Sequence, residues 1–211
     1  MEYAEIARAE SERGELVLRT RREDGAPEVL ELRANGVFVM DTVETTSERA
    51  LASAALGLGF TMREVLDDPR VERCTVVEIE QALVDWMRDG TIPHGPQMLA
   101  DHRLDLVVND VVLAFAEAAD TTYDLVLLDV DNGPGYLVHD TNAALYRTPL
   151  LRDVRRVTRG ALVIWSADTS AELEAALGEV FDDVRAVPYD VQLGHRAETY
   201  WLYVARVASA A

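Results

Sequence analysis

The segment from Tyr123 to Gly135 (YDLVLLDVDNGPG) constrains the fold of this chain more than any other stretch. A continuous apolar run, Leu125 to Leu128, is followed at once by Asp129 and Asp131 and then by glycine and proline. Such a run indicates a strand that is buried on both faces, as in a parallel sheet covered by helices. Ligands of these sheets bind in the crevice beyond the carboxyl ends of the strands. Asp129 is therefore predicted to be a site residue, with the capping of a turn as the alternative.

Around this segment, strand and helix patterns alternate from residue 57 to residue 181, which predicts βαβ units and a parallel sheet. Two further strands, 184–190 and 199–206, close the chain without a helix between them and are expected to form an antiparallel hairpin at one edge of the sheet. This ending is typical of the methyltransferase-like version of the Rossmann architecture. The predicted fold class is therefore α/β, with a Rossmann-like methyltransferase fold. Strands are expected at 74–79, 104–108, 123–129 and 161–165, and helices at 47–55, 61–68, 80–89, 111–119, 142–157 and 170–180.

The amino-terminal part has a different pattern. Apolar and polar residues alternate over 15–20 and 29–33, and Asn35-Gly36 is a strong two-residue hairpin signal before a third short strand at 37–40. We expect a three-stranded meander, preceded by about 13 residues in a helical or loose arm. The predicted domains are 1–45, the arm and meander, and 46–211, the Rossmann-like domain. A meander this small cannot bury a core alone, so it should pack on the main domain or on a second chain.

The amino-acid composition narrows the range of possible functions. The net charge of −18 argues against nucleic-acid binding, which needs a basic face. The same charge favours cationic ligands such as amines, although a solubilising surface explains it equally well. With one cysteine (Cys74), a charged amino terminus and no stretch long enough to span a membrane, the expected compartment is the cytoplasm. No metal site is expected, because metal-ligand spacing is absent around the four histidines, His94, His102, His139 and His195.

Polar or glycine residues mark four successive strand ends. Gly57 and Gly59 flank Leu58 just before a predicted helix, where a ligand can approach the backbone closely. Glu78, about 20 residues on, lies where an acid can accept both hydroxyls of a ribose. Asp110 ends the next strand, as an acceptor for an adenine amino group or as a helix N-cap. With Asp129 at the fourth end, the pattern suits an adenosine-containing ligand lying across the crevice.

These residues lie in segments that together resemble the spermidine synthase (polyamine aminopropyltransferase) family, which has the class I S-adenosylmethionine-binding fold. The resemblance covers most of the chain from about residue 28 onward. The segments that carry it are NGVFVMDTVETTSERAL (35–51), LGLGFTMREVLDDPRVERCTVVEIEQALVDW (56–86), VVND (107–110), YDLVLLDVDNGP (123–134), NAALYRTPLLRDVRRV (142–157) and ALVIW (161–165).

The resemblance implies an aminopropyl transfer from decarboxylated S-adenosylmethionine to an amine acceptor, without a metal. It places Gly57 and Gly59 beside the methionine-derived part, Glu78 at the ribose and Asp110 at the adenine. Asp129 then handles the attacking amine, and Asp131 holds a second ammonium of a di- or polyamine. The family also implies a homodimer formed through the amino-terminal region.

Two other functions stay open. Leu58 stands where the family has an acid that helps to hold the aminopropyl amine, so ordinary S-adenosylmethionine is an alternative, with methyl or aminocarboxypropyl transfer. The short interval between Ser47 and Gly57 leaves little room for a full first strand, which favours a non-catalytic relative that binds a nucleoside or a partner protein. A nicotinamide-dependent enzyme is a more distant possibility.

Overall fold

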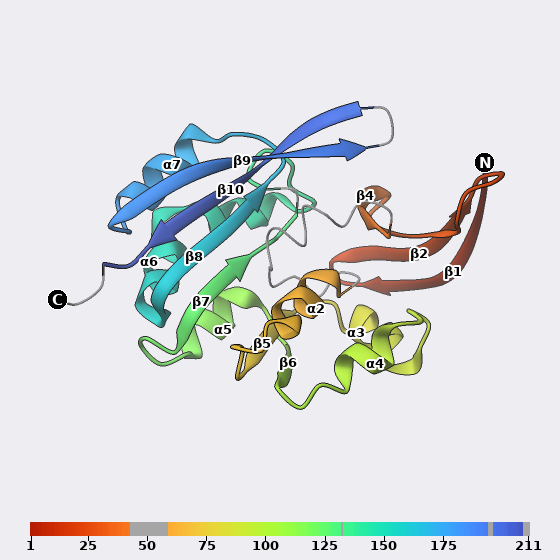
Figure 1. Cartoon of the computed structure of the whole chain (residues 1–211), viewed down its shortest axis with the longest axis horizontal. Coiled ribbons are helices and arrows are strands. Elements are labelled where there is room, and N and C mark those ends of the chain that lie inside the picture. The colour runs from red at the N-terminus through yellow and green to blue at the C-terminus, as the bar shows by residue number, and fades with distance from the viewer. Residues whose placement is uncertain (43–58, 132, 194–195, 209–211) are drawn as a thin grey trace.

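A computed structural model describes residues 1–42, 59–131, 133–193 and 196–208 (Figure 1). The helix expected at 47–55, Gly57, Leu58 and the domain boundary expected between residues 45 and 46 lie outside the described residues. In the described ranges, no helix has the length and apolar character needed to cross a membrane.

The amino-terminal part is a four-stranded antiparallel meander in the order β1-β2-β3-β4. The three expected strands are confirmed as β2 (Gly14–Arg22), β3 (Val29–Ala34) and β4 (Val37–Asp41). Asn35 and Gly36 both have positive φ, 52° and 76°, as a tight hairpin turn between β3 and β4 requires.

The prediction of a helical or loose arm at the amino terminus is wrong, because β1 (Glu2–Ser11) pairs with β2 from Glu2↔Arg22 to Ser11↔Gly14. Alanine and glutamate favour helix locally, but in β1 Ala7 and Ala9 pack against a hydrophobic core. Pairing and burial here outweigh intrinsic preference.

The rest of the chain is a Rossmann-like α/β arrangement. Two strand pairs are parallel: β5 (Cys74–Glu78) with β6 (Leu104–Val108), and β7 (Tyr123–Leu128) with β8 (Thr158–Ser166). The expected antiparallel hairpin is confirmed: β10 (Arg196–Arg206) pairs with both β8 and β9 (Asp183–Leu193), which gives the order β7-β8-β10-β9.

The helices are α2 (Phe60–Asp67), α3 (Gln81–Asp89), α4 (Gly95–Leu99), α5 (Val111–Glu117), α6 (Thr148–Val157) and α7 (Ala171–Gly178), with a 3₁₀ helix, η1 (Asp140–Tyr146).

One expected helix is divided in two. The segment 142–157 forms the end of η1 and then α6, with Arg147 extended between them. Pro149 explains the break, because proline fits the first turn of a helix but cannot donate the hydrogen bond that an interior position requires.

Hydrophobic residues gather in two cores. In one, Leu16, Leu18 and Leu32 of the meander pack with residues of α2, α3 and β5, including Met62 and Met87. The other lies between the sheet β7-β8-β10-β9 and helices α6 and α7 (Figure 1). The meander therefore buries its apolar face against the α/β part, as expected for a sheet too small to stand alone.

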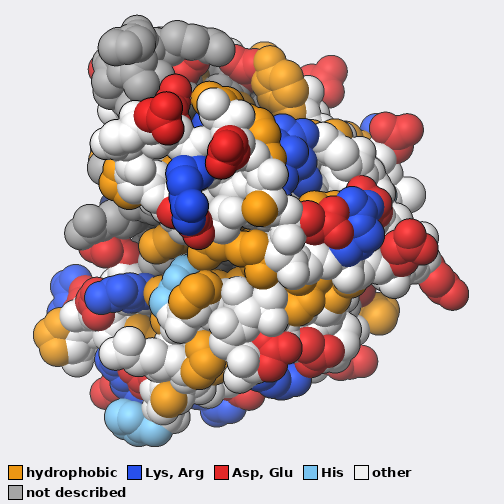
Figure 2. All heavy atoms as spheres, turned by 90° about the vertical axis from the view of Figure 1, so that its right-hand side faces the viewer, with side chains coloured by type: hydrophobic (Ala, Val, Ile, Leu, Met, Phe, Trp, Pro, Cys, Tyr) orange, Lys and Arg blue, Asp and Glu red, His pale blue; other side chains and the backbone are white. Residues whose placement is uncertain are grey.

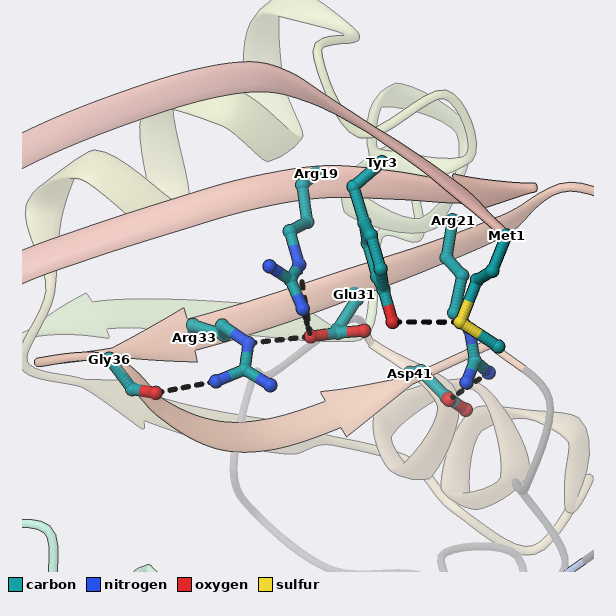
Figure 3. Close-up of polar contacts among 8 residues, drawn as sticks. All are labelled: Met1, Tyr3, Arg19, Arg21, Glu31, Arg33, Gly36 and Asp41. Atoms are coloured by element: carbon teal, nitrogen blue, oxygen red, sulfur yellow. Dashed lines mark hydrogen bonds and ion pairs between the residues drawn. The ribbon is translucent and has the colours of Figure 1, made fainter.

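The opposite face of the meander carries a network of ion pairs (Figure 3). Glu31 is only 3% exposed and accepts hydrogen bonds from Arg19 and Arg33, each at 2.6 Å. Arg21 pairs with Asp41 at 3.1 Å, and the Arg19 guanidinium lies over the Tyr3 ring. Two arginines thus compensate the one buried carboxylate on this face.

Candidate active site

A large cleft extends along β5 and β7, from their first residues to beyond their carboxyl ends, and along part of the meander, and four of the predicted site residues line it: Glu78, Asp110, Asp129 and Asp131. They come from segments up to 53 positions apart in the sequence. Each of them lies at or just beyond the carboxyl end of a parallel strand, β5 and β6 in one sheet and β7 in the other, which is where ligands of such sheets bind.

Glu78 is the last residue of β5, and its side-chain oxygen Oε1 accepts a hydrogen bond from the backbone N–H of Glu80 at 2.8 Å. Burial raises the pKa of this carboxyl to about 7, and the negative charge of Glu80 adds to the rise. The backbone N–H groups of Glu80 and Ile79 and the charge of Arg13 act in the opposite direction. Glu78 is thus an oriented, half-buried acceptor, which suits a neutral diol such as a ribose.

Asp110 is the N-cap of α5. Its Oδ1 accepts from the backbone N–H of Val112 at 2.8 Å, and Asn109 upstream donates its N–H to the Glu78 carbonyl at 3.0 Å. The capping role foreseen as an alternative is therefore present. The capping hydrogen bond uses one carboxylate oxygen of Asp110, and Asp110 still lines the cleft.

Asp129 and Asp131 follow the end of β7. Burial raises the pKa of Asp129 to about 7, and the charge of Asp131 raises it further. A carboxyl that titrates near neutral pH exchanges protons readily at that pH, which is the property of a general base. Asp131 has the left-handed conformation (φ 57°), which is uncommon outside glycine and is often found at functional sites.

Two side chains of η1 hold this pair of aspartates. The Asn142 amide Nδ2 donates to Asp131 Oδ2 at 2.9 Å. The buried Tyr146 hydroxyl donates to the Val130 carbonyl, between the two aspartates. Burial and then the charges of Asp129 and Asp131 raise the pKa of Tyr146 well above its usual range, so the hydroxyl keeps its proton and remains a donor.

Gly59 has a structural explanation of its own. It is the N-cap of α2 with φ 85°, and a Cβ there would lie 2.7 Å from the Met98 sulfur. Gly59 is not among the cleft-lining residues in the described part of the chain. Its contact with a ligand, like that of Gly57, stays a prediction.

Sequence reasoning missed several residues that shape this site. Neither Asn142 nor Arg13 was predicted as a site residue. Arg13 lies in the turn between β1 and β2, and its Nε is 3.2 Å from Glu80 Oε1. Gly14 is a local sign of a turn at this hairpin. The contact between Arg13 and Glu80, however, joins residues 67 positions apart, and no local sequence pattern predicts such a contact.

Within the described ranges, no group of three or more histidine, cysteine, aspartate or glutamate side chains is arranged to hold a metal ion.

Comparison with known proteins shows which family this chain resembles. A family model described as the spermine/spermidine synthase domain matches residues 32–187. The polyamine aminopropyltransferase of Ruegeria sp. (strain TM1040) is 30% identical over 130 residues, which cover 60% of this chain and 45% of that relative. The polyamine aminopropyltransferase of Saccharolobus solfataricus is 26% identical over 138 residues, covering 62% of this chain and 44% of the relative. The matched region thus spans less than half the length of these relatives.

A spermidine synthase solved in complex with the transition state analogue AdoDATO has the same fold, with a TM-score of 0.78 and 12% identity, over 97% of this chain and 74% of that one. This likeness confirms the predicted methyltransferase-like fold.

Proposed function

The chain belongs to the spermine/spermidine synthase family, and from this premise we propose that it transfers an aminopropyl group from decarboxylated S-adenosylmethionine to an amine acceptor. The observation that carries the proposal is the pair Asp129 and Asp131, which lines the same cleft as Glu78 and Asp110. The names of the relatives support the reaction class.

In the proposed complex, Glu78 accepts the ribose hydroxyls and Asp110 the adenine amino group. The acceptor amine lies at Asp129, and Asp131 pairs with a second ammonium when the acceptor is a di- or polyamine. Gly57 and Gly59 line the methionine-derived part. The assignments follow the family resemblance, and Glu78, Asp110 and Asp129 also lie at or just after the end of a strand.

In the proposed reaction, the neutral amine nitrogen attacks the carbon next to the sulfonium. A C–N bond forms, the C–S bond breaks with its electron pair going to sulfur, and methylthioadenosine leaves. The extra proton on the product nitrogen passes to Asp129 or to water. Positioning of the two reactants supplies much of the rate of such a displacement. Because the ionised carboxylate of Asp129 is needed, turnover should rise with pH through about 7.

Asp129→Asn tests this proposal. The amide keeps the shape of the side chain but can neither take a proton nor attract an ammonium, so turnover should fall by about 10² to 10⁴. Binding of methylthioadenosine, measured by calorimetry, should remain within about twofold because the nucleoside contacts are elsewhere. Asp124→Asn is the matched control: Asp124 also lines the long cleft, but it lies near the start of the same strand, is mostly exposed and pairs with Arg159.

The outcome separates the alternatives. Full activity in Asp129→Asn would remove Asp129 from the mechanism. Tighter binding of intact than of decarboxylated S-adenosylmethionine would favour methyl or aminocarboxypropyl transfer, and binding of neither would favour a non-catalytic relative.

We further propose a cytoplasmic homodimer that forms through the meander. Exposed apolar side chains on β1 and β4 support an interface there, among them Tyr3, Ile6, Val37 and Phe38. The single cysteine, Cys74, is free, as suits a reducing compartment. Light scattering should give twice the monomer mass, and a monomer at high concentration would contradict this interface.

A further inference from the structure

The turn between β1 and β2 is held rigidly at one end of the cleft. The backbone N–H of Arg13 donates to the Ser11 hydroxyl at 3.1 Å, and the Arg13 carbonyl accepts from the Asn35 amide at 3.1 Å. Asn35 Oδ1 also accepts from the backbone N–H of Glu15 at 2.9 Å. One side chain of the β3–β4 turn thus fixes the β1–β2 turn on both sides of Gly14.

This turn reaches the first residues of α3. The Arg13 guanidinium Nε lies 3.2 Å from Glu80 Oε1, and the Ser11 hydroxyl lies 3.5 Å from Glu80 Oε2. Glu80 in turn donates its backbone N–H to Glu78 Oε1 at 2.8 Å. A chain of contacts therefore runs from Arg13 through Glu80 to Glu78, and all three residues line the cleft.

We propose that Arg13 is a positioning residue of the nucleoside site: by holding Glu80, it keeps the Glu78 carboxylate in place to accept the hydroxyls of a ribose. The amino-terminal meander thereby completes one end of the site. This inference rests on the proposed function, because it takes Glu78 as the ribose acceptor.

Charge supports the same role. Glu78 and Glu80 are two carboxylates only two positions apart, and the negative charge of Glu80 raises the pKa of Glu78. Arg13 pairs with Glu80, and its charge lowers the pKa of Glu78. Asp110, the N-cap of α5, also lines the cleft, with one oxygen bound to the amide of Val112. Arg13 therefore offsets part of the negative charge of Glu78 and Glu80.

The test is a calorimetric titration of methylthioadenosine into wild type and Arg13→Gln across a range of pH. Near neutral pH the variant should bind about tenfold more weakly, the usual scale for one charge-assisted hydrogen bond. Because Glu78 then ionises at higher pH, the midpoint of the pH dependence of affinity should move upward, and the affinity should recover by about pH 9. Arg13→Lys, which keeps the charge, should restore most of the binding.

Arg8→Gln is the matched control. Arg8 lies on the same hairpin and pairs with Glu5 and Glu15, and it is not among the cleft-lining residues of the described ranges. Equal binding by Arg13→Gln and Arg8→Gln would overturn the inference. So would weaker binding by Arg13→Gln without a pH shift, since that would indicate a merely structural role. If wild type itself binds no nucleoside, the proposed function fails instead.

Discussion

At the scale of single residues, the site depends on carboxylates whose surroundings alter their chemistry. Burial brings the pKa of both Glu78 and Asp129 to about 7, one at each side of the cleft. The neighbours differ, however. At Glu78, backbone N–H groups and the charge of Arg13 oppose burial and the like charge of Glu80, whereas at Asp129 the like charge of Asp131 adds to burial. The first arrangement favours a fixed acceptor, and the second favours a group that attracts a cation or takes a proton.

Tyr146→Phe tests whether η1 positions the aspartates. The change removes the hydroxyl donor from the partly buried Val130 carbonyl, which should cost about 1–3 kcal/mol of stability. The loosened loop should lower kcat by about tenfold, while the affinity for methylthioadenosine stays unchanged. Steady-state kinetics and calorimetry check the two parts.

Tyr123→Phe is the matched control, because Tyr123 begins the strand that ends beside the aspartates and packs on the same core. Equal kcat values for the two variants would show that the Tyr146 hydroxyl has no positioning role.

At the scale of elements, the β1–β2 hairpin depends on one glycine. Gly14 has φ 111°, a conformation that other residues rarely adopt, and an added Cβ would overlap the Asn35 amide. Gly14→Ala should therefore lower the free energy of unfolding by about 2–4 kcal/mol, as read from urea denaturation. Because the same amide holds the Arg13 carbonyl, nucleoside binding should weaken as well.

Gly25→Ala separates strain from overlap. Gly25 also has positive φ, 81°, but nothing lies within 4 Å of an added Cβ. Gly25→Ala should therefore lower the free energy of unfolding less than Gly14→Ala does. The difference between the two variants is the cost of displacing Asn35. Similar losses would mean that Asn35 moves aside freely.

Sequence patterns predicted correctly those elements that are determined by residues close together in the chain. Asn35-Gly36 specified its turn, and the apolar run before Asp129 specified β7 and the edge where the carboxylates meet. The strand β1 was missed because its alanines favour helix until they pair with β2. Arg13 and Asn142 were missed for a related reason: their roles arise from contacts between segments that no local pattern links.

At the scale of the whole molecule, acidic residues exceed basic ones in the meander as well as around the cleft. On the side that carries the meander, acidic and basic side chains are interspersed (Figure 2), and several of them form ion pairs on the face opposite the core. Residues 1–42 still carry ten acidic residues against six arginines, within a chain whose net charge is −18. The cleft contains Glu78, Asp110, Asp129 and Asp131. An approaching amine should therefore be drawn by the molecule's overall charge and then by this cleft.

Ionic strength tests this attraction. For a diamine acceptor, kcat/KM should fall several-fold between about 0.05 M and 0.5 M salt, because the screening length shrinks from more than 10 Å to about 4 Å. Methylthioadenosine is neutral, so its dissociation constant should change by less than about twofold over the same range. If both quantities respond alike, the excess of acids serves solubility, and the amine reaches Asp129 without long-range help.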